Sequence, residues 1–247
     1  MFPATLTPFQ RTGLLIGLLL WAVLLFGGFV FGRPDPANTR RMPTSTRLLS
    51  SAVLVLAGWS WYALARETAA TRYTLAVALG MSFGLLGDIA MAGLLPLSNR
   101  VIGGIVAFGV GHLCYIAAFL GLGGQAGLTG SSRWPLLAVW LALGVVGWYV
   151  VVQRGQPFSA LRTAALVYAL LLATTAGLAA GLAWQARPFV PLALGAGLFF
   201  LSDLILAGQL FGGLSFPLIG DVIWLTYGPG QMLIVFSGAA AMRLTGA

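Results

Sequence analysis

The stretch YTLAVALGMSFGLLGDIAMAGLL, residues 73–95, contains a single charged residue, Asp88. A membrane-spanning helix needs roughly 20 mostly apolar residues, so this stretch is long enough to cross a bilayer. Seven more apolar stretches of similar length lie at residues 12–31, 47–65, 101–122, 134–152, 161–184, 189–211 and 217–242. The sequence therefore predicts an all-α, polytopic membrane protein with eight transmembrane helices.

Charged residues, glycines or prolines separate these stretches, as Arg33-Pro34-Asp35-Pro36 separates the first two. The first stretch follows Arg11 and is not followed by a small-residue cleavage pattern, so we interpret it as a helix rather than a signal peptide. We expect one transmembrane domain over residues 1–247. Because the number of spans is even, both ends of the chain should lie on the same side of the membrane.

The composition of the 247-residue chain agrees with this interpretation. Hydrophobic residues make up 59% of the chain and charged residues 7%, whereas soluble domains carry roughly 25% charged residues. A soluble enzyme is therefore excluded. One His and one Cys are too few for a disulfide framework or for a metal site built from several His or Cys ligands, so we expect no metal and no cofactor.

All 13 basic residues are arginines, and they are scattered singly between apolar runs. The net charge of +8 therefore does not indicate nucleic-acid binding. Such arginines are typical of loop and interface anchors in a multi-pass protein, which we expect in a bacterial inner or plasma membrane. They divide seven to six between the two sides, which leaves the orientation open. The sequence makes no prediction for the oligomeric state.

The residues around Asp88 recur 115 positions later in the chain. The motifs Ala78-Leu79-Gly80, Leu86-Gly87-Asp88 and Ala92-Gly93 correspond to Ala193-Leu194-Gly195, Leu201-Ser202-Asp203 and Ala207-Gly208. The same offset relates Arg47 to Arg162 and His112 to Tyr227. These matches predict a parallel 4+4 internal repeat, with halves at about 10–122 and 134–243. The alternative is a chance match between helices of similar composition.

Asp88 and Asp203 are the two carboxylates deep within the predicted spans, whereas Asp221 lies near the start of the last one. Both lie roughly 21–24 Å from the start of their helices, in the half of the bilayer from which Arg47 and Arg162 enter. A carboxylate inside a bilayer costs about 2.5–3.5 kcal/mol on insertion scales, so it seldom persists without a partner or a role. We expect a polar cavity between the helices. The alternative is that each Asp pairs with an Arg to hold helices together.

Other polar residues fall near this predicted cavity. His112, with Tyr115 three residues later, either bridges helices or acts chemically. Tyr227 and Gln231 flank Gly228-Pro229-Gly230, a sequence that loosens a helix and is tolerated at membrane depth where it lines a cavity or is buried in protein. The stretch Gly80-Met81-Ser82-Phe83-Gly84 fits the serine-hydrolase pattern but lies within a predicted span, so we interpret it as a packing face.

Four motifs resemble the YhhN-type lysoplasmalogenase family of eight-helix integral membrane hydrolases. They are LLGDIAMAG (85–93), FGVGHLCYIAAF (108–119), LGAGLFFLSDLILAG (194–208) and TYGPGQMLI (226–234). The resemblance runs from about residue 43 to 236 and implies hydrolysis of the vinyl-ether bond of lysoplasmalogens. The products would be a fatty aldehyde and glycerophosphoethanolamine or glycerophosphocholine. Family members often have Lys-Pro where this chain has Met42-Pro43.

The resemblance implies that Asp88 and Asp203 are the catalytic residues. Vinyl-ether hydrolysis needs a neutral carboxyl that protonates the alkene, and a second carboxylate can stabilise the cation and activate water, as in glycoside hydrolysis. Arg47 or Arg162 would hold the phosphate of a lysophospholipid substrate. We expect the remaining substrate-binding residues to be His112, Tyr115, Tyr227 and Gln231.

Two alternative functions remain open from the sequence. Parallel repeats with acidic residues near the midplane also suit a proton-coupled membrane transporter. A hydrolase of the same fold could act on a different lysolipid. Cleavage of a vinyl-ether substrate but not of its saturated analogue distinguishes the first hypothesis from both.

Overall fold

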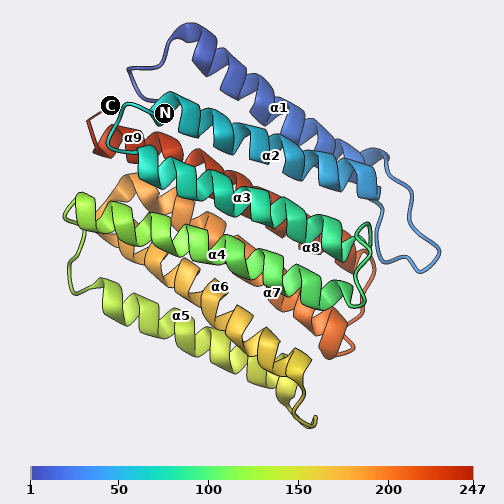
Figure 1. Cartoon of the computed structure of the whole chain (residues 1–247). Coiled ribbons are helices and arrows are strands. Elements are labelled where there is room, and N and C mark those ends of the chain that lie inside the picture. The colour runs from blue at the N-terminus through green and yellow to red at the C-terminus, as the bar shows by residue number, and fades with distance from the viewer. Residues whose placement is uncertain (1, 247) are drawn as a thin grey trace.

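The computed structural model describes residues 2–246, which form helices and no strands (Figure 1). The long helices are α1 (Pro8–Phe31), α2 (Thr44–Ala65), α3 (Thr71–Met91), α4 (Arg100–Gln125), α5 (Arg133–Trp148), α6 (Ala160–Gln185), α7 (Val190–Phe211) and α8 (Ile219–Phe236). A π-helical turn, Tyr149–Gln153, continues α5; a 3-10 turn, Arg187–Phe189, precedes α7; and a short helix, α9 (Gly238–Leu244), follows α8.

The chain is a multi-pass membrane protein by the length and hydropathy of its helices. Seven of the described helices are long and apolar enough to cross a bilayer, and α8 is an eighth long helix, interrupted in composition by Asp221, Pro229 and Gln231. The eight predicted stretches are confirmed as helices, and several of their ends differ from the prediction by a few residues. The third helix ends at Met91, because Gly93 adopts a left-handed backbone with φ +74°. The last stretch is divided at Ser237 into α8 and α9.

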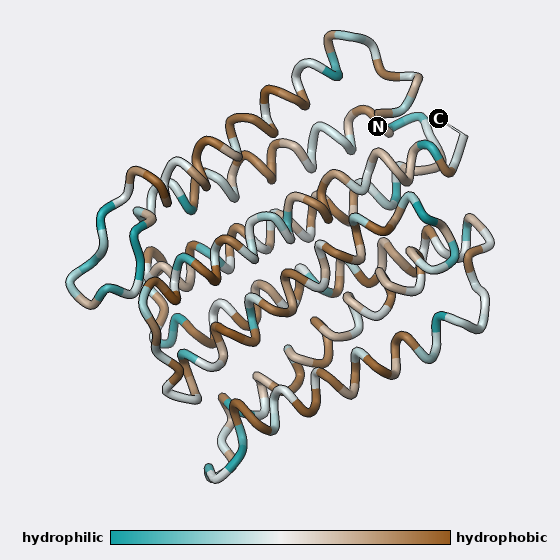
Figure 2. Tube along the Cα trace, turned by 180° about the vertical axis from the view of Figure 1, so that it is seen from behind, coloured by the Kyte–Doolittle hydropathy of each residue, from teal (hydrophilic) through white to brown (hydrophobic). Residues whose placement is uncertain are grey.

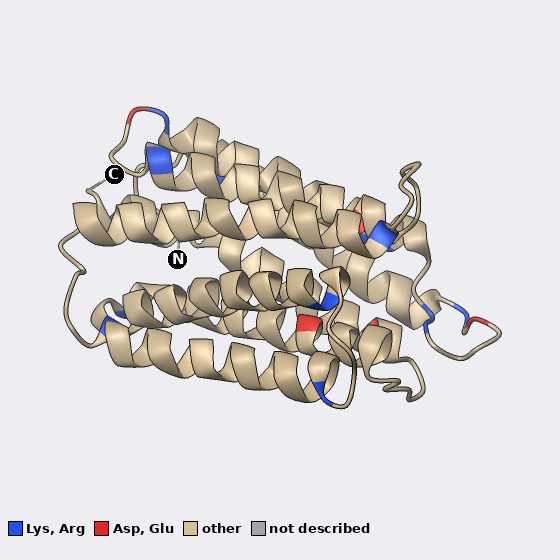
Figure 3. Ribbon diagram, turned by 60° about the horizontal axis from the view of Figure 1, so that its bottom comes forward, with Lys and Arg blue, Asp and Glu red and all other residues tan. Residues whose placement is uncertain are grey.

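The helices run side by side, and the two ends of the chain lie at the same end of the bundle, as predicted (Figure 1). Apolar residues dominate the helices, whereas the hydrophilic segments gather at the two ends of the bundle (Figure 2). Most of the charged residues also lie at these ends (Figure 3). The polar ends mark the two membrane surfaces.

Glycines on α3 let neighbouring helices approach it closely. A Cβ added at Gly84 would lie 2.9 Å from Gln231 Nε2 on α8, and one added at Gly87 would lie 2.7 Å from the ring of Phe108 on α4. Gly80 is in similarly close contact with the ring of Tyr115. The Gly80–Gly84 segment is therefore a packing face within a helix, as predicted. This close packing brings α4 and α8 side chains to the level of Asp88.

Helix pairing follows the same order in both halves of the chain. α3 packs against α2 and α4, and α7 packs against α6 and α8. α4 also contacts α6, as α8 contacts α2. This is the arrangement that the predicted repeat would produce, and the repeat itself stays a prediction.

The loop between α1 and α2 is tied to the start of α8. Leu218 N donates to Asn38 O and Gly220 N to Thr39 O, each at 2.8 Å. The buried Asp221 side chain accepts hydrogen bonds from Arg41 N at 2.5 Å and Met42 N at 3.0 Å. Asp221 thus holds the loop that precedes α2 in place. Within this loop, the Thr39 hydroxyl donates to Asp35 and holds the pKa of that carboxyl below its ordinary value.

Candidate functional site

A polar cavity of about 320 Å³ lies between α2, α3, α4, α7 and α8, in the half of the bundle where the α1–α2 loop lies. Asp88 and Asp203 both line it, so the structure brings the two predicted carboxyls to one cavity. Arginines from three different segments line it as well: Arg40, Arg47 and Arg100. The cavity therefore combines two carboxyls with three guanidinium groups.

Asp88 is held by hydroxyl groups from two other helices. It is 5% exposed, and its Oδ2 accepts hydrogen bonds from Ser51 Oγ at 2.6 Å and Tyr227 OH at 3.2 Å. Tyr227 OH in turn accepts from Gln231 Nε2 at 3.1 Å, and Gln231 Oε1 accepts from Tyr115 OH at 2.9 Å. This buried chain of hydrogen bonds fixes the carboxyl of Asp88 at the cavity wall.

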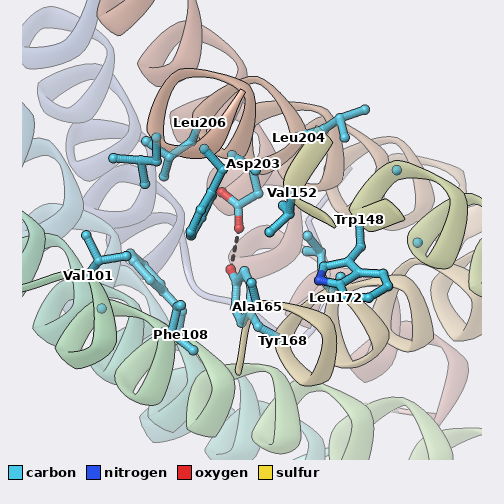
Figure 4. A pocket seen from close by; sticks show the side chains of 18 of the residues that line it. Val101, Phe108, Trp148, Val152, Ala165, Tyr168, Leu172, Asp203, Leu204 and Leu206 are labelled. Atoms are coloured by element: carbon cyan, nitrogen blue, oxygen red, sulfur yellow. Dashed lines mark hydrogen bonds between the residues drawn. The ribbon is translucent and has the colours of Figure 1, made fainter. Parts of the chain in front are cut away.

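Asp203 is held by a separate network that starts on α6. Tyr168 OH donates a hydrogen bond to Asp203 Oδ2 (Figure 4). The Tyr168 hydroxyl also lies 3.4 Å from His112 Nε2, and His112 Nδ1 lies 3.0 Å from Thr175 Oγ1. His112 therefore reaches Asp203 through Tyr168 rather than directly. His112, Tyr115 and Gln231 do not line the cavity themselves, and their predicted contact with the substrate stays a prediction.

No guanidinium group forms an ion pair with either carboxyl. Among residues 2–246, the one salt bridge within 4.0 Å joins Arg40 to Asp35 at 3.8 Å. Arg47 instead donates to Thr44 Oγ1 at 3.0 Å and lies over the ring of Trp224, with 5.3 Å from Cζ to the ring centroid. The structure therefore does not contain the alternative arrangement, in which Asp88 and Asp203 each pair with an Arg to hold helices together. Neither Asp88 nor Asp203 is therefore neutralised by an arginine within ion-pair distance.

The family comparison covers all of this site except the two residues that the α1–α2 loop contributes, Thr39 and Arg40. The YhhN family model matches residues 44–238. The chain belongs to the YhhN family. No curated protein and no solved structure matches it. The YhhN match includes Asp88, Asp203 and Arg47, and it begins at the first residue of α2. Arg40, which precedes the matched region, is contributed by the loop that Asp221 anchors.

Arg162 lies outside the cavity that the YhhN motifs form. Its guanidinium donates to Val152 O at 3.1 Å, Pro157 O at 3.0 Å and Gln156 Oε1 at 3.1 Å. The π-helical turn after α5 supplies one of these carbonyl groups, so Arg162 closes the α5–α6 connection. The structure thus separates Arg162 from Arg47, its predicted repeat mate.

The sequence did not identify four residues of this site: Ser51, Tyr168, Arg40 and Arg100. Tyr168 is an isolated polar residue in an apolar part of α6, and that isolation was an available signal, whereas Ser51 directly follows Ser50 in α2 and does not stand out. Ser51 and Tyr168 are not separated by the 115 positions of the predicted repeat, so the repeat did not identify either residue. Arg40 and Arg100 were interpreted as surface anchors, and only the folded loops bring them to the cavity.

Proposed function

We propose that this YhhN-family protein is an integral membrane hydrolase that cleaves the vinyl-ether bond of lysoplasmalogens. The products are a fatty aldehyde and glycerophosphoethanolamine or glycerophosphocholine. The observation that carries the proposal is the placement of Asp88 and Asp203 in one cavity without a cationic partner on either. Unpaired carboxyls at membrane depth are expensive, and acid–base chemistry is a role that accounts for both.

The reaction begins with proton transfer to carbon. One carboxyl is neutral and donates its proton to the alkene carbon that bears the hydrocarbon chain, using the π electrons of the double bond. The adjacent carbon and the ether oxygen then share the positive charge of an oxocarbenium ion. The second, ionised carboxyl stabilises this cation electrostatically, as paired carboxyls do in glycoside hydrolysis.

Water completes the reaction. Its oxygen bonds to the cationic carbon while its proton passes to the carboxylate, which gives a hemiacetal. The hemiacetal hydroxyl then returns a proton to the first carboxyl as the C–O bond to glycerol breaks, and the second carboxyl protonates the departing oxygen. Both carboxyls end in their starting states, and one water is consumed per bond cleaved.

The arginines bind the head group in this proposal. Arg47, Arg40 and Arg100 line the same cavity as the carboxyls, and guanidinium groups bind phosphate with charge-assisted hydrogen bonds. Thr44 and Trp224 position the Arg47 side chain. The phosphate of a lysophospholipid therefore lies toward the membrane surface, and its ether bond lies deeper, beside the carboxyls. Such a substrate reaches the site from the bilayer of a bacterial inner membrane.

A substrate panel tests the proposal. Purified protein is incubated with lysoplasmenyl-ethanolamine, with its saturated 1-alkyl ether analogue and with the 1-acyl ester, and aldehyde and fatty acid release are measured. The proposal predicts aldehyde from the vinyl ether alone. Release of fatty acid from the ester would instead indicate a hydrolase of another lysolipid. Lysolipid or proton uptake into sealed vesicles without any cleavage would indicate a transporter.

A further inference from the structure

A second cavity lies behind Asp203, and its lining is almost entirely apolar. It is lined mainly by residues of α4, α5, α6 and α7, including Leu172, Leu204 and Trp148 (Figure 4). α4 and α7 both pack against α6, and the cavity lies between them. In Figure 4, Asp203 and Tyr168 point toward one another across the middle of this lining.

The two cavities share one wall, and Asp203 is part of it. Asp203, Phe108 and Met91 line both the polar and the apolar cavity, together with Leu206 and Leu210. Asp88 lines the polar cavity and is not among the residues of the apolar one. The two carboxyls therefore differ in position: Asp203 lies at the junction between polar and apolar space, and Asp88 lies on the polar side of it.

We propose that the apolar cavity binds the hydrocarbon chain of the lysolipid next to the vinyl ether, and that Asp203 is therefore the residue that protonates the alkene. This inference rests on the proposed function. An amphiphile bound across the shared wall places its phosphate near Arg47 and its chain against Leu172 and Leu204. An almost entirely apolar cavity accepts the hydrocarbon chain of an amphiphile and not its charged head group. The cavity therefore determines which way round the ligand binds.

The orientation of the substrate divides the catalytic roles. The alkene carbon that accepts the proton bears the chain, so it faces the apolar side and Asp203. The carbon that accepts water is bonded to the ether oxygen, so it faces the polar cavity and Asp88. Asp88 accepts two hydroxyl hydrogen bonds, and Asp203 also accepts two, from Tyr168 and, at 3.3 Å, from Ser202. The division of roles therefore rests on where the two carboxyls lie relative to the two cavities. Asp203 donates the proton to carbon, and Asp88 takes the proton from water.

Filling the apolar cavity tests where the chain binds. Gly147 on α5 lines the apolar cavity and not the polar one. A Cβ added there would meet only Leu204 Cδ1, at 3.1 Å. Gly147→Leu is expected to weaken binding of a saturated 1-alkyl ether lysolipid at least tenfold and binding of chainless glycerophosphoethanolamine less than twofold. Ala165→Leu, from α6, provides a second filling variant. Ala142→Leu, on the exposed face of α5, is the matched control and should change neither affinity.

A photoreactive lysolipid gives a readout that does not depend on activity. A saturated ether lysolipid with a diazirine on the third chain carbon should label residues of the apolar cavity, such as Ala165 or Leu172. Labelling confined to the outward-facing Val139 and Val146 of α5, or equal loss of affinity for both ligands in Gly147→Leu, would overturn the proposal. Neither of these saturated ether probes is cleaved, so their binding and labelling can be measured even if the protein does not hydrolyse vinyl ethers. An absence of vinyl-ether hydrolysis would refute the proposed function without deciding where the chain binds.

Reaction in D₂O tests the division of roles. Asp203 delivers deuterium to one face of the alkene, so the wild-type aldehyde, trapped by reduction to the alcohol, should carry deuterium in one configuration. Residual product from Asp88→Asn should keep that configuration, whereas residual product from Asp203→Asn should be a mixture of both. The reverse result would assign the proton to Asp88 and contradict the proposed orientation.

Discussion

Asp88 and Asp203 line one cavity, but each accepts its hydrogen bonds from different helices. Ser51 on α2 and Tyr227 on α8 hold Asp88, whereas Tyr168 on α6 holds Asp203. The two carboxyls are therefore positioned independently. A substitution in one network should change one carboxyl and leave the other in place.

Removal of the Tyr168 hydroxyl tests the network around Asp203. Tyr168→Phe keeps the ring that packs against His112, with 5.5 Å between ring centroids, and removes the hydrogen bond. This hydrogen bond stabilises the carboxylate that forms as Asp203 gives up its proton, and a hydrogen bond to a charged group contributes about 1.5–3 kcal/mol. The value of kcat should therefore fall roughly 10- to 100-fold while KM changes little. Tyr149→Phe, at an exposed tyrosine, is the control. An unchanged kcat in Tyr168→Phe would show that this hydroxyl does not position Asp203.

Two arginines related by the proposed repeat should behave differently. Arg47 lines the polar cavity, so Arg47→Met should raise KM roughly tenfold or more, and Arg47→Lys should restore part of the affinity. Arg162 binds backbone carbonyls outside that cavity, so Arg162→Met should lower the melting temperature and leave KM unchanged. Steady-state kinetics and thermal unfolding in detergent measure both effects. A rise in KM in Arg162→Met would show that Arg162 contributes to substrate binding after all.

The contact between α7 and α8 depends on two glycines. A Cβ added at Gly195 would lie 2.8 Å from Gly230 O and 2.7 Å from Leu233 Cβ. Gly195→Ala should therefore destabilise the protein by about 1–3 kcal/mol. Gly121→Ala, where an added Cβ would meet no atom within 4 Å, should not lower the melting temperature. Equal melting temperatures for the two variants would show that the α7–α8 contact tolerates a side chain.

Asp221 should control the loop that carries Arg40. Its buried carboxyl accepts two backbone N–H groups, from Arg41 and Met42, and its loss leaves both without that acceptor. Asp221→Ala should reduce the free energy of unfolding by about 1–3 kcal/mol and speed tryptic cleavage after Arg40 or Arg41. Glu67→Ala, in an exposed turn, is the control. Cleavage at the same rate in both variants would contradict this role for Asp221.

The positions of the helices could be predicted from the sequence because a helix that crosses a bilayer needs an apolar stretch of roughly 20 residues. The helix ends depended on local backbone, as at Gly93, where a left-handed residue ends α3 before the apolar stretch does. The division between α8 and α9 at Ser237 also could not be anticipated. There, the Tyr73 hydroxyl from a distant helix lies 2.6 Å from Ser237 Oγ.

The carboxyl pair was predictable because charges within apolar spans are rare and conspicuous. Ser51 and Tyr168 were not, because a hydroxyl side chain is common in membrane helices and its partner is set by helix packing. The contrast between Arg47 and Arg162 arises from local structure that a sequence offset does not encode. Arg47 lies in the first turn of α2, whereas Arg162 lies in the first turn of α6 and binds one carbonyl of the preceding π-helical turn.

The most direct test of the account measures aldehyde release from lysoplasmenyl-ethanolamine by the wild type and by Asp88→Asn and Asp203→Asn. Each variant is first shown to be folded by its melting temperature and by its affinity for the saturated ether lysolipid. With Asp88 and Asp203 as the catalytic pair, the wild type should release aldehyde and each variant should lose at least 100-fold of that activity. Aldehyde release at the wild-type rate by either folded variant would contradict this assignment, and so would an absence of aldehyde from the wild type.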